Sequence, residues 1–120
     1  QMTVNHSSTQ PSGFRVHSYE LDGWMVVECH GRLISQNAPL LREEVRPLLG
    51  KCKQILVDLK EVPMMDSSGL GTIVTLYVSA RTRGCQLRLN NANQQIRDLF
   101  RMTNLLSLFE LAGRHHGKTF

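Results

Sequence analysis

Residues 54–71 read QILVDLKEVPMMDSSGLG, and this stretch sets the arrangement expected for the rest of the chain. Its first six residues form a short apolar run with little alternation, which favours a central strand covered on both faces. After a connection at residues 61–65, Asp66 and Ser67 form a pair that can cap a helix. Apolar residues at helical spacing then predict an amphipathic helix: Leu70, Ile73, Val74, Tyr77 and Val78. A buried strand that leads into a capped helix predicts an α/β fold.

The segment before this stretch predicts a hairpin. Asp22 and Gly23 are typical of a tight hairpin turn, with a strand at residues 14–17 before it and another at residues 24–30 after it. Gly31 is expected to end the second strand, and residues 32–37 are expected to form a loop.

A first helix should follow that loop. Asn37 is expected to cap it and Pro39 to lie in its first turn. Its apolar residues recur at helical spacing: Leu41, Val45, Leu48 and Leu49. Pro47 lacks a backbone N–H, so we expect the helix to kink or end there, with Gly50 closing it.

The segment after the central helix should continue the alternation of strands and helices. Gly84 is expected to end that helix, and residues 86–89 to form a short strand. The asparagines among residues 90–93 can cap a third helix, marked by Ile96, Leu99 and Phe100. Residues 105–111 predict a last strand.

These elements predict one α/β domain, because 120 residues leave no room for two independent cores. We expect a mostly parallel or mixed sheet of four to five strands with helices packed on it. Residues 1–13 are expected to be a disordered N-terminal tail, residues 14–111 the domain, and residues 112–120 a C-terminal tail.

Composition and charge exclude several functions. No apolar run approaches the roughly 20 residues that span a bilayer, so membrane insertion is not expected. A polar run follows Met2, unlike a signal peptide, so we expect a cytoplasmic protein. Residues 80–120 carry 7 Lys or Arg and 2 Asp or Glu, but no nucleic-acid motif is present, so nucleic-acid binding is not expected. The cysteines and histidines lack metal-ligand spacing, so no metal and no cofactor are predicted.

The candidate site is the segment from Met64 to Gly71. Gly69 and Gly71 in the first turn of a helix cost about 1 kcal/mol each against alanine, which suggests close approach by another backbone. The unpaired N–H groups of a helix N-terminus stabilise a phosphate, so Ser67 is suited to phosphorylation. Alternatively, Asp66 and the serines only cap the helix and the glycines only permit tight packing. The segment lacks the ending of a P-loop and the spacing of a nucleophile elbow.

Together, residues 55–59, 62–71 and 96–106 resemble the signature of STAS domains, above all that of bacterial anti-sigma factor antagonists. The likeness covers about residues 14–111. It implies a partner switch and not an enzyme. Ser67, with Ser68 as the second choice, would be phosphorylated by an anti-sigma factor that is also a serine kinase, and a serine phosphatase would reset it. The unphosphorylated form would bind the anti-sigma factor and so regulate sigma-factor-dependent transcription.

The resemblance also assigns a partner-binding surface, which includes Arg32 and the whole candidate segment: Met64, Met65, Asp66, Ser67, Ser68, Gly69, Leu70 and Gly71. The methionines suit either an adaptable contact surface or the core. Arg32 lies where the family often has an acidic residue. This difference motivates an alternative, a non-switching scaffold subunit of a stress-signalling or transporter-associated complex. A weaker alternative is nucleotide binding at the helix N-terminus.

Overall fold

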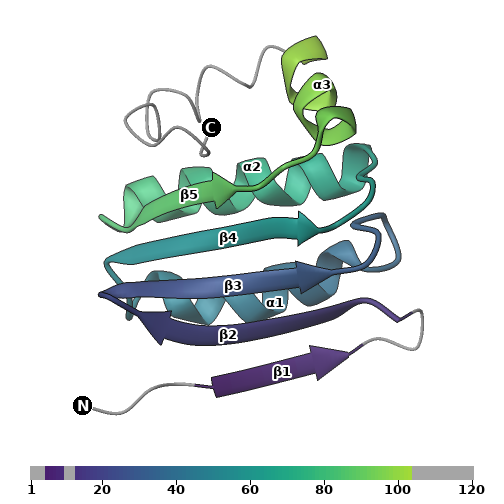
Figure 1. Cartoon of the computed structure of the whole chain (residues 1–120). Coiled ribbons are helices and arrows are strands. Elements are labelled where there is room, and N and C mark those ends of the chain that lie inside the picture. The colour runs from purple at the N-terminus through teal and green to yellow at the C-terminus, as the bar shows by residue number, and fades with distance from the viewer. Residues whose placement is uncertain (1–4, 10–12, 104–120) are drawn as a thin grey trace.

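The computed structural model describes residues 5–9 and 13–103, which form one mixed sheet with helices packed on one face (Figure 1). Its elements follow one another along the chain as β1 (Asn5–Thr9), β2 (Arg15–Leu21), β3 (Trp24–His30), α1 (Ala38–Leu49), β4 (Gln54–Glu61), α2 (Ser67–Thr82), β5 (Gln86–Asn90) and α3 (Gln94–Met102). The predicted α/β class, the mixed sheet and the packed helices are confirmed.

The five strands lie in the sheet in chain order. The first three are antiparallel neighbours, whereas β3, β4 and β5 are parallel. The connections β3–α1–β4 and β4–α2–β5 both move one strand further in the same direction across the sheet. Because such crossovers are right-handed, both helices lie on the same face of the sheet. Figure 1 shows α1 and α2 behind the sheet and α3 beyond β5.

The core lies between the sheet and these helices. Alternate strand residues point into it, and many are completely buried: Val16, Val27, Ile55, Val57, Leu59 and Leu89. On α2 the buried residues are Leu70, Ile73, Leu76, Tyr77 and Ala80, whereas Val78 is 54% exposed. The helix therefore presents a slightly different face to the core than the sequence predicts.

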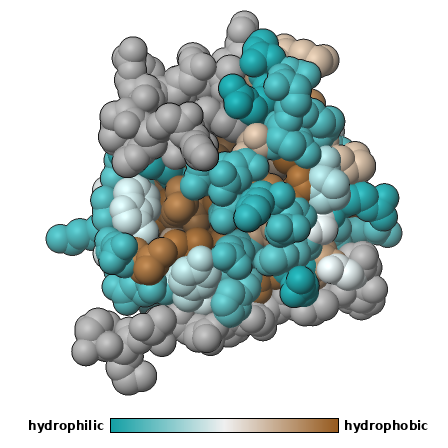
Figure 2. Space-filling view, in the orientation of Figure 1, coloured by the Kyte–Doolittle hydropathy of each residue, from teal (hydrophilic) through white to brown (hydrophobic). Residues whose placement is uncertain are grey.

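The other face of the sheet carries no helix among the described residues. Figure 2 shows apolar atoms in the middle of this face with polar atoms around them. The expectation that β4 is covered on both faces is wrong for these elements, because burial alternates along the strand. Leu56 and Asp58 are half-buried between fully buried neighbours.

The hairpin prediction is confirmed. Asp22 and Gly23 adopt positive φ angles of 51° and 85°, which a tight turn of this kind requires. The strand before them, β2, extends four residues beyond the predicted end at residue 17.

One expectation about local structure is corrected, and another is confirmed in part because Gly50 closes α1 as predicted. Asn5–Thr9, which the sequence placed in a disordered tail, forms β1 and pairs with β2. Helix α1 continues for two residues past Pro47 and ends at Leu49, with Gly50 as its C-cap. The proline is tolerated because it lies in the last turn. The predicted last strand at residues 105–111 lies outside the described residues, and the domain limits at residues 14 and 111 stay predictions.

Candidate functional site

The candidate site is built around the carboxylate of Asp66, which lies at the junction between β4 and α2. Asp66 has extended backbone angles and is the N-cap of α2. Its Oδ1 accepts a hydrogen bond from the backbone N–H of Gly69 at 3.0 Å, and its Oδ2 accepts one from the backbone N–H of Ser35 at 3.1 Å. One side chain therefore both begins the helix and ties it to the loop after β3. The predicted capping role is confirmed.

The loop after β3 is held against this junction by backbone pairing. Leu33 forms an isolated parallel bridge with Met65. The N–H of Leu33 donates to the oxygen of Met64 at 3.1 Å, and the N–H of Asp66 donates to the oxygen of Leu33 at 3.3 Å. The pairing of β3 with β4 thus resumes beyond both strands, and it brings the loop that contains Arg32 beside the start of α2.

Helix α3 holds the same junction from the other side. Gln95 Oε1 accepts a hydrogen bond from the backbone N–H of Met65 at 3.2 Å. Asn93 Nδ2 donates to the backbone oxygen of Pro63 at 2.9 Å, while Asn93 Oδ1 accepts from the N–H of Ile96 at 3.0 Å and caps α3. Two segments that are distant in sequence, the loop after β3 and the start of α3, therefore fix the backbone on which the two serines stand.

The structure divides the predicted site residues into a supporting set and an exposed set. The supporting set is buried and consists of Met65, Gly69 and Leu70. Asp66 and Met64 are half-buried, and the exposed set consists of Arg32, Ser67, Ser68 and Gly71. The two interpretations of the methionines thus apply to one residue each, since Met65 belongs to the core and Met64 reaches the surface.

The two glycines of the motif have different surroundings. A Cβ atom on Gly69 would overlap the backbone oxygen of Leu33 and lie 2.7 Å from Cγ of Met65. The expected close approach of another backbone is therefore confirmed at Gly69. A Cβ atom on Gly71 would meet nothing within 4 Å, so packing among the described residues does not require glycine at this position.

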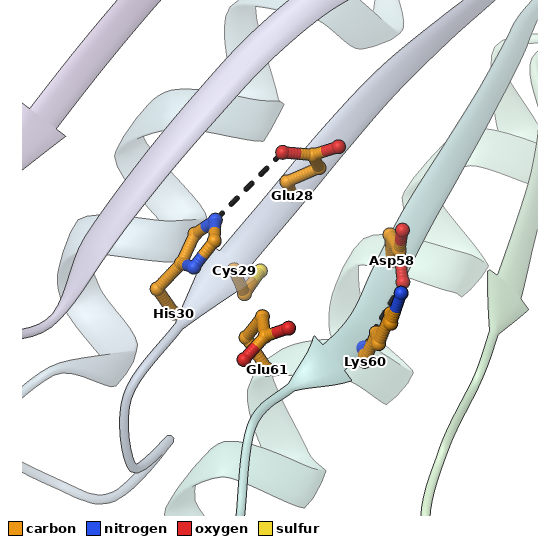
Figure 3. Close-up of a pocket in the computed structure, with 6 residues that line it drawn as sticks. All are labelled: Glu28, Cys29, His30, Asp58, Lys60 and Glu61. Atoms are coloured by element: carbon orange, nitrogen blue, oxygen red, sulfur yellow. Dashed lines mark hydrogen bonds and ion pairs between the residues drawn. The ribbon is translucent and has the colours of Figure 1, made fainter.

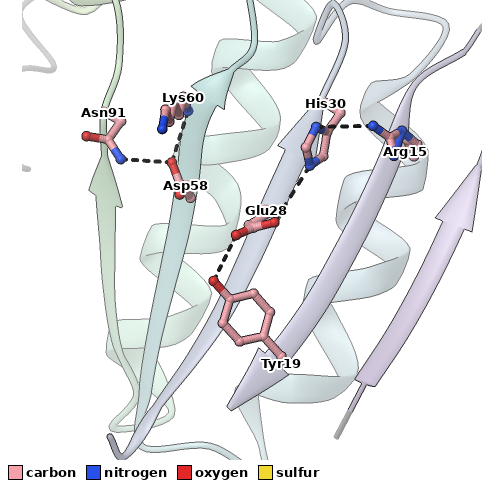
Figure 4. A network of polar contacts seen from close by, with 7 residues as sticks. All are labelled: Arg15, Tyr19, Glu28, His30, Asp58, Lys60 and Asn91. Atoms are coloured by element: carbon pink, nitrogen blue, oxygen red, sulfur yellow. Dashed lines mark hydrogen bonds and ion pairs between the residues drawn. The ribbon is translucent and has the colours of Figure 1, made fainter. Parts of the chain in front are cut away.

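The helix-free face of the sheet carries a separate polar network, shown in Figure 4. Glu28 and Asp58 lie opposite each other on the paired strands β3 and β4, where like charges are unfavourable. The Tyr19 hydroxyl donates to Glu28 at 2.8 Å, and Asn91 Nδ2 donates to Asp58 at 3.1 Å. The hydrogen bond to Glu28, helped by burial, raises the pKa of Tyr19 to about 12. These partners stabilise the two carboxylates within the fold.

A hollow of about 180 Å³ lies on the same face, between the ends of β3 and β4 (Figure 3). Its polar lining residues are Glu28, His30, Asp58, Lys60 and Glu61. His30 Nε2 lies 3.7 Å from Glu28 Oε1. No three acidic, histidine or cysteine side chains in the described part of the chain are placed to hold a metal ion. The described side chains of the hollow therefore interact with one another and do not form a metal-binding site.

Sequence reasoning missed the residues that position the site from outside the motif. Leu33, Ser35, Asn93 and Gln95 all contact the junction, but each lies about 30 residues from its partner. The sequence analysis considered the asparagines at residues 90–93 only as caps. Asn37 is the N-cap of α1 by position, but its side-chain Nδ2 donates to the backbone oxygen of Arg32 at 2.6 Å and makes no capping hydrogen bond.

None of the described helices is long and apolar enough to cross a bilayer.

Comparison with known proteins finds similar sequences among bacterial anti-sigma factor antagonists. The anti-sigma-B factor antagonist of Bacillus subtilis (strain 168) is 31% identical over 91 residues, which are 76% of this chain and 84% of that protein. The anti-sigma-B factor antagonist of Listeria monocytogenes serovar 1/2a is 33% identical over 82 residues, which are 68% and 72% of the two chains.

Solved structures agree with these relatives. A crystal structure described as that of an anti-sigma factor antagonist from Thermotoga maritima superposes with a TM-score of 0.71 at 25% identity and covers 76% of this chain and 80% of its own. The STAS domain family matches residues 15–117, which include all the elements from β2 to α3. The sheet, the helix that begins at Ser67 and this match over most of the chain together place the protein in the STAS domain family.

Proposed function

We propose that this protein is an anti-sigma factor antagonist that acts by partner switching at Ser67. In this proposal the unphosphorylated form binds an anti-sigma factor that is also a serine kinase, and phosphorylation of Ser67 releases it. The observation that carries the proposal is the exposure of Ser67 at the first position of α2, on a junction held by the loop after β3 and by the start of α3. The similarity to anti-sigma-B factor antagonists supports the same role.

The switch follows from charge and needs no refolding. A phosphoserine carries about −1.5 to −2 charges at neutral pH. The N-terminus of α2 tolerates this charge within the folded protein, because its free N–H groups and dipole favour anions. At an interface the same charge must lose water and meets any acidic group of the partner. Phosphorylation should therefore weaken binding while the fold of the domain is retained.

Three further statements belong to this proposal. A serine phosphatase returns the protein to its binding form. The protein is a regulator and not an enzyme, and it acts in the cytoplasm, where sigma factors engage RNA polymerase. It does not contact nucleic acid directly, because no nucleic-acid motif accompanies the basic residues of its second half, which also suit an acidic protein surface.

Binding measurements with two substitutions at Ser67 test the proposal. Ser67→Ala should bind the serine-kinase partner, purified from the host by co-purification, in the presence of ATP. Ser67→Asp should bind at least tenfold more weakly by calorimetry. The matched control is Ser68→Ala, which alters the neighbouring exposed serine and should still lose affinity upon incubation with ATP. Equal affinities of the Ala and Asp variants would exclude a switch at Ser67.

A second candidate function is that of a non-switching scaffold subunit, and Arg32 favours it. Arg32 is exposed and precedes Leu33, which pairs with Met65 just before α2, so it adds a positive charge to the loop at this junction. A positive charge at this position favours a partner whose surface differs in charge from the surfaces that the switching proteins bind. Co-purification with a transporter ATPase, together with an unmodified Ser67, would support this candidate over the switch.

A further inference from the structure

A groove of about 390 Å³ runs between the first turns of α1 and α2, next to the proposed switch. One wall comes from α1 and Ser35 in the loop before it, and the other comes from α2. Its lining residues are Ser35, Ala38, Pro39, Arg42, Ser68, Gly71, Thr72 and Thr75. Ser68 lines the groove, whereas Ser67 is exposed but is not among the lining residues. Successive residues of a helix point about 100° apart, so the two serines present their hydroxyls in different directions.

The lining of the groove suits a phosphate group. Four of its residues carry hydroxyls, and Arg42 is its single charged residue within the described part of the chain. Arg42 is half-buried, and its guanidinium has no ion pair or hydrogen bond with the described residues. Arginine binds phosphate through several N–H donors at once, so a half-buried arginine without a partner marks a site for an anion.

Thr72 and Gly71 give independent support. Thr72 is only 7% exposed, yet it lines the groove, and its hydroxyl makes no hydrogen bond within residues 13–103. The hydroxyl lies at the groove and can donate a hydrogen bond to an anion oxygen placed there. Gly71 leaves open space where any other residue would place a Cβ atom, so the glycine keeps the groove wide at the turn after Ser68.

We propose that Ser68 is a second phosphorylation site and that Arg42 binds its phosphate across this groove. The phosphoryl group would come from a nucleoside triphosphate through the serine kinase of the proposed function. A bond forms between Ser68 Oγ and the γ-phosphorus, the bond to the bridging oxygen breaks, and the nucleoside diphosphate leaves. The hydroxyl proton passes to a base of the kinase. Only the source of the phosphate rests on the proposed function; the phosphate-binding role of Arg42 does not.

The two phosphoserines would differ in consequence. A phosphate on Ser67 stays at the surface, where it repels a partner and a phosphatase can reach it. A phosphate on Ser68 lies against Arg42, which neutralises part of its charge and shields it. Phosphorylation at Ser68 would therefore fill the groove and give a form that a phosphatase reverses more slowly.

The test places phosphoserine at residue 67 or residue 68 of the full chain by genetic encoding and follows the phosphate by ³¹P NMR titration. The ordinary second pKa of phosphoserine is about 6. With phosphoserine at residue 68, Arg42→Gln should raise this pKa by about half a unit or more, because an opposite charge within about 6 Å favours the charged form. The matched control is Arg46→Gln, which removes an exposed arginine from the last turn of α1 outside the groove and should change nothing.

The outcomes are separate from those that test the switch, because encoded phosphoserine needs neither a kinase nor a partner. If Arg42→Gln has no effect at residue 68, or an equal effect at residue 67, the Arg42 site does not exist. Mass spectrometry of the Ser67→Ala variant from its host tests the modification itself. We expect phosphate on Ser68 in that variant, and its absence under all growth conditions that activate the kinase would overturn the second site.

Discussion

Alanine substitutions at Gly69 and Gly71 should change stability in opposite directions, although the two residues lie two positions apart in one helix. Intrinsic helix propensity favours alanine by about 1 kcal/mol at either position. At Gly69 the new Cβ atom would lie 2.7 Å from Met65 Cγ and overlap the oxygen of Leu33. Ordinary contacts between carbon atoms are about 3.5–4.0 Å, so Met65 Cγ must move by about 1 Å, and the loop after β3 must shift as well to relieve the overlap at Leu33.

The free-energy cost of that movement exceeds the stabilisation that alanine gains from its higher helix propensity. Overpacking of this kind costs about 1–3 kcal/mol, and the hydrogen bond from Asp66 to the Leu33 oxygen, worth about 1 kcal/mol, would weaken with it. We therefore expect Gly69→Ala to lower the free energy of unfolding by about 1–3 kcal/mol. Gly71→Ala meets nothing within 4 Å and should raise it by about 0.5–1 kcal/mol.

Urea denaturation of the wild type and both variants measures these changes through the transition midpoint at constant m-value. The Gly71 variant serves as the matched control for helix propensity. A Gly69→Ala protein as stable as the Gly71→Ala protein would refute the close packing of the loop against α2, and with it the fixed junction at the site.

Three other predictions follow from the contacts of single side chains. Asp66→Ala removes the N-cap and the bond to the loop, so the unfolding free energy should fall by about 1–2 kcal/mol in urea titrations, whereas Asp66→Asn, which can still cap, should lose less. The pKa of Tyr19 is raised from 10 to about 12, so its contribution to stability is complete below pH 10 and is lost as the pH rises toward 12. Absorbance titration should show this high pKa, and Glu28→Gln should lower it. Burial raises the pKa of Cys29 to about 12, so a thiol reagent at pH 8 should modify half-buried Cys52 first and Cys29 only after unfolding.

The elements that the sequence predicted best are those whose signals are local. The turn at Asp22 and Gly23 needs positive φ angles, which few dipeptides supply, so its position was predictable. Asp66 was predictable as the N-cap of α2 because a capping carboxylate acts within three residues of itself. The strand at Trp24–His30 likewise begins with aromatic and β-branched residues, namely Trp24, Val26 and Val27.

The errors arose where tertiary contacts decide the outcome. Asn5–Thr9 has no apolar alternation, and it forms a strand through backbone pairing with β2. Pro47 suggested an earlier break, but two more residues complete the last turn of α1. Among the described elements, helices cover β4 on one face because both crossovers step across the sheet in the same direction, and no local sequence pattern indicates this.

The candidate site was predictable in its motif but not in its support. The residues from Met64 to Gly71 carry a recognisable pattern, yet the pattern alone does not separate buried Met65 from the more accessible Met64. Nor does it indicate that Leu33 and Gln95 would hold the same backbone, since their contacts depend on how β3 and α3 meet the sheet.

Site-mapped mass spectrometry of the protein from its host, with and without phosphatase treatment, tests the central claim most directly. The switch at Ser67 predicts a phosphate on that residue in the fraction that does not bind the serine-kinase partner, and an unmodified Ser67 in the fraction that does. Phosphatase treatment should then restore binding. An unmodified Ser67 in both fractions, under growth conditions in which the partner is both bound and released, would contradict the account.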